Sequence, residues 1–284
     1  MKKILISLVV LSFYFGATAQ EENALLWKVS GNGIESPSYL YGTIHFICPD
    51  DFKMEESVKN AFDQTAQLFL EIDFDDPAMM GEMQQELMMK DGKSATDFLD
   101  EKSFQSLDKF FTDNIGISLK QVSTMKPFAL MSLMIIPLTG CQPKSFETEF
   151  VQMASQKGSE VLGLESVKYQ MGLFDSIPYQ KQYDMLVKMA ASPKEATEEF
   201  KQMTDAYKNH DLSALSVMMD DSEWDYRGYE DLLIYTRNAN WIPLIEKAAK
   251  ESPTFFAFGA GHLPGKKGVI NLLKQAGYKI EPVN

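Results

Sequence analysis

Two short Gly-x-x-His motifs hold two of the three histidines in the chain. They run from Gly42 to His45 and from Gly259 to His262, and each follows an apolar run that predicts a β-strand. Imidazole is a common metal ligand and a common general base near neutral pH. Either motif alone could be a turn with an incidental histidine. Their repetition in equivalent settings favours one shared site, closed when the two ends of the chain meet.

Two glutamates lie in or directly after apolar runs, where burial of a carboxylate would be unfavourable. Glu71 lies in the apolar run 67–74, and Glu165 directly follows the run 161–164. A buried carboxylate costs free energy unless it is paired or binds a metal. Strand alternation would place Asp73 on the same face as Glu71. The alternatives are a solvated strand end for Glu71 and a helix cap for Glu165. We predict that both glutamates belong to the site.

Arg237 lies in a segment that predicts a helix, 229–250. It is either a surface residue or a clamp for a carboxylate or for an oxyanion formed in a reaction. Other chemistries lack their motifs in this sequence. There is no Gly-x-Ser-x-Gly elbow and no His-Glu-x-x-His helix. The glycines at 31–33 and 259–261 do not complete a dinucleotide-binding fingerprint.

The elements that must position these residues alternate in kind along the chain. Strand patterns occur near both ends, and residues from about 77 to 222 are mainly helical in pattern. This order predicts an α/β fold with the central helices as a cap or insertion. Sites in such sheets form at strand ends, where both Gly-x-x-His motifs would lie.

The first 19 residues predict a signal peptide. Lys2 and Lys3 precede the apolar stretch 4–15, and a small-residue cleavage site follows at 17–19. We therefore predict an exported protein, periplasmic or secreted, with no transmembrane anchor in the mature chain. The formal net charge of −13 at pH 7 gives no electrostatic reason to bind nucleic acid. A peptide or small-molecule substrate is the expected partner.

The chain has two cysteines, Cys48 and Cys141. In an oxidising compartment the default prediction is a disulfide between them. The alternative is a role in the site for Cys48, which lies three residues after His45. A disulfide would tie the loop after His45 to the middle of the chain.

Several segments resemble the TraB/GumN family. The two ends carry the more specific part of the resemblance, and shorter matches lie between them: 26–31, 38–45, 163–166, 237–241 and 255–265. The family is similar to the Tiki proteins, regarded as metal-dependent proteases with paired Gly-x-x-His motifs, and distantly to erythromycin esterases. The resemblance implies a single domain over 20–284, with a central mixed β-sheet from the N- and C-terminal parts and a helical cap.

The resemblance also implies a site. His45, Glu71 and His262 would gather there, with Glu165 and Arg237 as additional members. We predict an exported metal-dependent hydrolase, in its leading form a peptidase. Manganese, cobalt or zinc would be held by His45, His262 and one or both of Glu71 and Glu165, because mixed nitrogen and oxygen ligands suit several of these metals. The second carboxylate would act as general base, and Arg237 would stabilise the oxyanion.

Two alternatives remain open from the sequence. One is a metal-independent hydrolase of the esterase kind, in which a histidine oriented by a glutamate activates water. The other is a protein without catalytic activity that binds or inhibits a peptide or ligand in the same cleft. A histidine variant that keeps its fold would separate binding from cleavage.

Overall fold

The computed structural model describes residues 23–221 and 227–283. The signal peptide predicted over 1–19 lies outside these residues. None of the described helices combines the length and apolar character needed to span a membrane.

One mixed sheet of six strands organises the molecule, in the order β4-β3-β5-β2-β1-β6. The strands are β1 (Leu26–Ser30), β2 (Ser38–Thr43), β3 (Gln67–Leu70), β4 (Glu160–Gly163), β5 (Thr254–Gly259) and β6 (Lys279–Pro282). Strands β2, β5, β3 and β4 are parallel, whereas β1 is antiparallel to both β2 and β6. The predicted α/β fold with a mixed sheet is therefore confirmed.

The local sequence explains the centre of this sheet. Strands β2 and β5 are almost entirely buried, as expected for parallel strands covered on both faces. β1 and β2 form a hairpin around a turn in which Gly31 and Gly33 have positive φ. β3 ends at Leu70, earlier than the apolar run 67–74 suggests. The chain turns directly after it, so strand alternation does not extend to Asp73.

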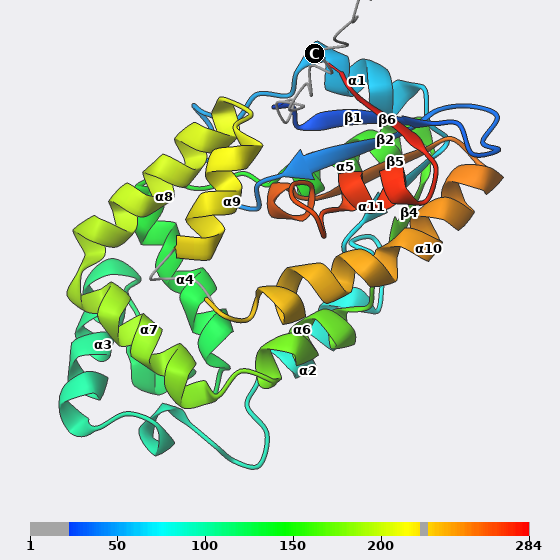
Figure 1. Ribbon diagram of the computed structural model, residues 1–284. Helices are drawn as coiled ribbons and strands as arrows, with labels where there is room; N and C mark the ends of the chain where they lie inside the picture. The colour runs from blue at the N-terminus through cyan, green and yellow to red at the C-terminus, as the bar shows by residue number, and fades with distance from the viewer. Residues whose placement is uncertain (1–22, 222–226, 284) are drawn as a thin grey trace, which may run out of the picture.

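Four helices pack on the sheet: α1 (Glu56–Asp63), α5 (Phe146–Lys157), α10 (Thr236–Glu251) and α11 (Val269–Gln275). The remaining ones are α2 (Met79–Glu86), α3 (Glu101–Asn114), α4 (Pro127–Thr139), α6 (Val167–Asp175), α7 (Tyr179–Ala191), α8 (Pro193–Lys208) and α9 (Leu212–Asp221). Of these, α3, α4, α7 and α8 pack together away from the sheet, on the left side of Figure 1. Within the predicted helical middle, α5 and β4 return to the sheet.

A covalent tie joins the loop after β2 to the segment before α5. Cys48 and Cys141 form the predicted disulfide, which excludes a free thiol at Cys48. Beside it, Ile47 and Lys144 exchange two backbone hydrogen bonds of 3.1 and 2.8 Å as an antiparallel bridge. We call residues 46–48 and 141–144 the disulfide ribbon. It holds the chain that leaves His45 against the chain that enters α5.

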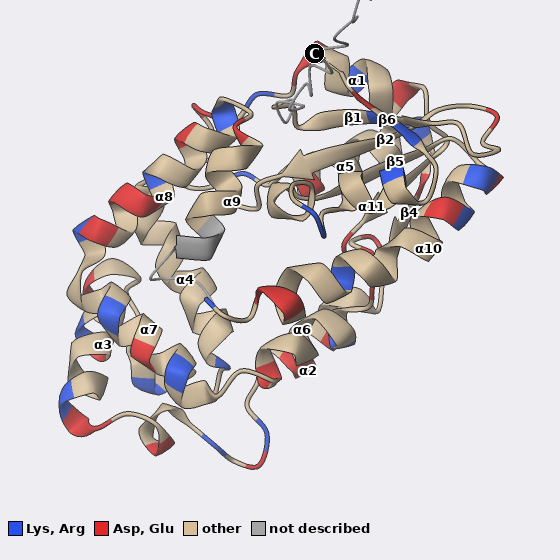
Figure 2. Cartoon of the chain, viewed as in Figure 1, with Lys and Arg blue, Asp and Glu red and all other residues tan. Residues whose placement is uncertain are grey.

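Charged side chains lie mainly on exposed helix faces. Figure 2 shows acidic and basic residues interspersed along α8. One example is the exposed pair Lys201–Asp205, with 2.8 Å between Nζ and Oδ2. Such pairs contribute little to stability, about 0.2–1 kcal/mol each. The groups that could do chemistry are instead gathered at one edge of the sheet.

Candidate functional site

The two Gly-x-x-His motifs meet because β2 and β5 are parallel neighbours. Gly42 pairs with Phe258 in this register, so both strands end at the same edge of the sheet. A Cβ atom at Gly42 would lie 2.7 Å from Leu263 Cδ1 and 2.9 Å from Ala260 Cα. The turn that carries His262 therefore packs directly on Gly42. This glycine permits a close approach of backbones, not a turn with positive φ.

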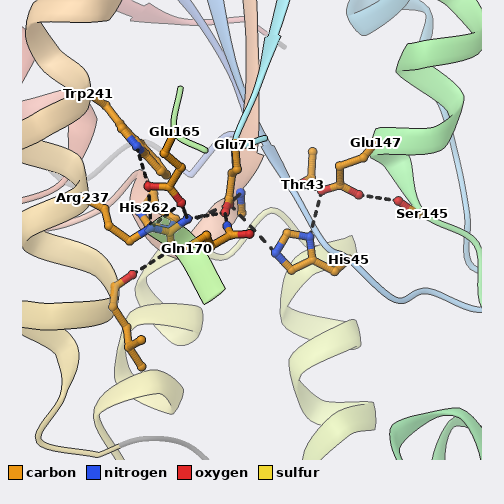
Figure 3. Close-up of polar contacts among 12 residues, drawn as sticks. Thr43, His45, Glu71, Ser145, Glu147, Glu165, Gln170, Arg237, Trp241 and His262 are labelled. Carbon is orange, nitrogen blue, oxygen red and sulfur yellow. Dashed lines mark hydrogen bonds and ion pairs between the residues drawn. The ribbon is translucent and has the colours of Figure 1, made fainter. Parts of the chain in front are cut away.

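The structure brings together the five residues that the sequence selects. They are His45 after β2, Glu71 after β3, Glu165 after β4, His262 after β5 and Arg237 on α10 (Figure 3). Four of them follow the carboxyl ends of parallel strands, the usual place for a site in an α/β sheet. Direct or shared contacts link all five.

Arg237 is the hub of the buried part of this cluster. Its Nη2 donates to Glu71 Oε2 at 2.5 Å and to Glu165 Oε1 at 2.6 Å. Its Nη1 donates to Leu233 O at 2.9 Å and to His262 Nε2 at 3.1 Å, and Nε donates to Glu165. A guanidinium has five N–H donors, and all five have acceptors here. An oxyanion would reach Arg237 only after displacing one of these partners.

The contacts of His262 define its protonation. Arg237 can only donate, so His262 Nε2 accepts and Nδ1 carries the proton. That proton is donated to Asn238 Oδ1 at 2.5 Å. Burial, together with the nearby Arg237 charge, lowers the pKa of His262 to about 3. His262 is therefore a neutral imidazole whose Nε2 lone pair faces the cluster.

The two glutamates differ in their surroundings. Burial raises the pKa of Glu71, but Arg237 and the neighbouring histidines outweigh it and hold that pKa well below its usual range. Glu71 Oε2 also accepts from Gln170 at 2.6 Å, and Oε1 accepts from Gly259 N at 2.9 Å. For Glu165 burial dominates, and its pKa is raised despite the bonds to Arg237 and Trp241. Glu71 is thus the firmly ionised carboxylate.

His45 forms the exposed side of the cluster. Its side chain is 56% exposed, whereas those of Glu71 and His262 are 6% and 4% exposed. Its Nε2 lies 4.0 Å from Glu71 Oε1. Its Nδ1 lies 2.9 Å from Glu147 Oε1 on α5. Desolvation lowers the pKa of His45, but Glu147, with help from Glu71, outweighs it and raises that pKa to about 9.

Glu147 is the residue that the sequence analysis missed. It is 3% exposed and accepts from Thr43 Oγ1 at 2.7 Å and from Ser145 Oγ at 2.5 Å. In the sequence it is an acidic residue in the first turn of a helix, which helix dipoles explain equally well. Asp73 is the opposite case. It turns toward the backbone of Asp75 and Asp76 and is no part of the cluster.

The residues at the mouth of the cluster leave a small space between them. A Cβ atom at Gly259 would lie 3.4 Å from Glu71 Oε1, 3.6 Å from His45 Nε2 and 3.7 Å from His262 Cδ2. These are ordinary van der Waals distances, so an atom fits among the three side chains. Glycine at position 259 keeps this space open.

The same residues offer the atom types that bind a divalent cation, but as arranged they do not form a metal site. Both Nε2 atoms lie close to Glu71 Oε1, at 4.0 Å for His45 and 3.9 Å for His262. Two ligands at about 2.1 Å from one zinc ion are at most about 4.2 Å apart. Metal binding would have two requirements. Arg237 Nη1 must release His262 Nε2, and His45, whose pKa is about 9, must give up the proton on its Nε2. Accordingly, within residues 23–221 and 227–283 no group of three or more His, Cys, Asp or Glu residues could hold a metal ion as arranged.

The chain is similar to several curated proteins over most of its length. "Metalloprotease TIKI2" of Danio rerio is 23% identical over 92% of this chain and 61% of its own length. The Xenopus tropicalis protein of the same name is 24% identical, covering 93% of this chain and 60% of its own. "Metalloprotease TIKI1" of Homo sapiens is 23% identical, with 92% and 62% covered.

This chain therefore spans about six-tenths of the length of these relatives. No solved structure matches it significantly. The TraB/PrgY/gumN family model matches residues 25–282. This range covers nearly all of the residues that the structure describes and includes all five residues of the cluster. The chain belongs to the TraB/PrgY/gumN family.

Proposed function

We propose that this protein is an exported, metal-dependent hydrolase that cleaves peptides. The space at Gly259 is the observation that carries the proposal. It is bounded by Glu71 Oε1, His45 Nε2 and the His262 ring, which are groups of the kind that hold or activate a hydrolytic water. The similarity to proteins named metalloproteases supports the same reaction class.

His45, Glu71 and His262 would hold the metal through Nε2, a carboxylate oxygen and Nε2. A bound divalent cation would polarise the scissile carbonyl and lower the pKa of a water. Arg237 would then act in two ways. Its bonds to Glu71 and Glu165 hold both carboxylates in place, and Nη1, once released from His262, is free to donate to a developing oxyanion.

Glu165, one of the two glutamates from which the sequence predicts a general base, has both oxygens engaged by Arg237 and Trp241. Glu71 Oε1 is the carboxylate oxygen that borders the space at Gly259. We therefore propose Glu71 Oε1 as the carboxylate ligand of the metal, with Glu165 balancing the charge of Arg237. The carboxylate that is ionised over the wider pH range thus faces the reacting atoms.

Substrate would reach the cluster along His45. A surface hollow of about 280 Å³ lies beside this residue, lined by Phe46, Pro143, Lys144 and Ser145, with Thr148 and Glu149. The lining offers apolar surface, hydroxyls and both signs of charge. Such a surface suits a peptide, which presents carbonyl oxygens, N–H groups and side chains together.

Chelation is expected to abolish cleavage. Purified mature protein should contain about one Mn, Co or Zn ion per chain by inductively coupled plasma mass spectrometry, and the His262→Ala variant should contain less than about one tenth of this. Cleavage of a mixed peptide library should fall at least about tenfold with 1,10-phenanthroline and return with added metal. If the protein binds peptides but cleaves none with any of the added metals, it is instead a binding protein.

A second candidate, a metal-independent hydrolase, has one observation in its favour. Arg237 Nη1 already occupies the lone pair of His262 Nε2, as it would in a site that uses no metal. In that case Glu71, beside His45, would activate water directly. Cleavage that survives complete chelation, and is lost in Glu71→Gln, would select this candidate over the first.

Gly259→Ala is expected to abolish cleavage while leaving the stability of the fold nearly unchanged. The backbone at Gly259 has φ −48° and ψ 132°, which alanine adopts, and the added methyl makes only van der Waals contacts. We expect the free energy of unfolding to change by less than about 1 kcal/mol. Cleavage should fall at least about 100-fold, since the methyl fills the space for water or metal.

Gly172→Ala is the matched control, because nothing lies within 4 Å of its added Cβ. It should leave cleavage within about twofold of wild type. Full activity in Gly259→Ala would place the reaction elsewhere.

A further inference from the structure

We propose that Glu147 is a positioning residue that fixes the His45 imidazole with Nε2 toward Glu71. The inference rests on the proposed function only in that His45 acts in the reaction. It assigns to Glu147, on α5, a task in a site otherwise formed by strand ends and α10 (Figure 3).

The orientation follows from the hydrogen bonds of Glu147. Its Oε1 accepts from Thr43 Oγ1 at 2.7 Å and its Oε2 accepts from Ser145 Oγ at 2.5 Å, so both carboxylate oxygens act as acceptors. His45 Nδ1, 2.9 Å from Glu147 Oε1, therefore donates its proton to that oxygen. Nδ1 is thereby turned away from the cluster, and Nε2 lies 4.0 Å from Glu71 Oε1.

Glu147 is itself held from two sides. Thr43 Oγ1 donates to the same oxygen as His45, and Ser145 Oγ donates to the other. Thr43 ends β2, two residues before His45, and Ser145 is the N-cap of α5. Carboxylate and imidazole are therefore fixed relative to one another by both chain segments that they join.

The disulfide ribbon keeps these segments in register. One strand of the ribbon begins at Phe46, next to His45, and the other ends at Lys144, next to Ser145. The His45 side chain is 56% exposed, so the hydrogen bond to Glu147 is the contact that selects its rotamer. Without Glu147 its imidazole would sample other rotamers and the opposite ring orientation.

A purely structural role explains Glu147 less well. Burying a carboxylate costs free energy that two hydroxyls offset only in part. A hydrophobic side chain of similar volume at this position would stabilise the protein as well or better. Orienting partners of catalytic or metal-binding histidines, by contrast, typically contribute about 10–100-fold to activity or metal affinity.

Histidine NMR tests the orientation without any substrate. The chain has only three histidines, so ¹⁵N-histidine labelling with the His45→Gln and His210→Gln variants assigns the signals. Wild type should show a downfield, hydrogen-bonded Nδ1–H proton for His45. Glu147→Gln should shift that proton upfield, and Glu147→Asp should restore it in part. An unchanged His45 signal in Glu147→Gln overturns the proposal.

Kinetics add a readout that a structural role would not move. In Glu147→Gln we expect kcat to fall about 10–100-fold with KM within about twofold, because the substrate hollow is intact. Glu82→Gln is the matched control, since it makes the same change at an exposed position of α2, and we expect cleavage within about twofold of wild type. If Glu147→Gln does not fold, the Thr43→Val/Ser145→Ala pair loosens the carboxylate instead and should weaken the same NMR signal. The NMR result stands even if no peptide is cleaved.

Discussion

Replacing Arg237 with methionine is expected to lower the free energy of unfolding by about 3–5 kcal/mol. The guanidinium is 8% exposed and pairs with two carboxylates, Glu71 and Glu165, that are 6% and 5% exposed. Removing it leaves two negative charges buried side by side. This destabilises the protein more than replacing the arginine and both carboxylates together would. Urea denaturation followed by tryptophan fluorescence would measure the loss, with an unchanged m-value as the sign of two-state unfolding.

Two variants make this expectation specific. Lys194→Met also removes a cation, at an exposed position of α8, and should change stability by less than about 0.5 kcal/mol. Adding Glu71→Gln and Glu165→Gln to Arg237→Met should recover part of the loss, because the carboxylates left behind cause it. A loss below about 1 kcal/mol in Arg237→Met would mean that solvent reaches these charges, contrary to their burial.

Replacing Cys48 and Cys141 with serine is expected to cost about 2–5 kcal/mol in the free energy of unfolding. The two residues are 93 positions apart, so the bridge closes a long loop in the unfolded chain. The disulfide ribbon would also lose its covalent tie beside His45 and Ser145. We therefore expect cleavage to fall together with stability, at temperatures well below the melting transition.

Reduction provides the check on this second prediction. Dithiothreitol should lower the melting temperature of wild type to about that of the double serine variant, and it should leave the variant unchanged. A double variant as stable as oxidised wild type would contradict the prediction. It would show that the unfolded chain gains no conformational entropy when the bridge is removed.

The strand ends of the site could be predicted from the sequence because they depend on local patterns. Apolar runs predicted the strands that precede His45 and His262. Glu71 was selected because a carboxylate buried in an apolar run costs free energy unless it is paired or binds a metal. The structure confirms the α/β fold and the disulfide. The roles of the site residues stay predictions.

Other parts depended on tertiary contacts that no local pattern records. Glu147 looks like any acidic residue at a helix start until α5 is placed against β2. All N–H donors of Arg237 are engaged, and their acceptors are Leu233, four residues earlier, and three residues distant in sequence: Glu71, Glu165 and His262. Gly42 resembles a turn glycine, whereas its observed role is to admit the chain around Ala260. Each of these is a property of the packed molecule.

The place of β5 in the sheet has a consequence for how the molecule assembles. This strand is the second last in the chain but lies between β3 and β2, and it joins Thr254 to Ser38 across 216 residues. Until it inserts, the strands made earlier form two separate pairs, β4-β3 and β2-β1. Such distant pairing slows folding, because loop entropy is lost before any contact is gained. A nascent chain therefore carries the two halves of the cluster apart and acquires the site only after β5 has been synthesised.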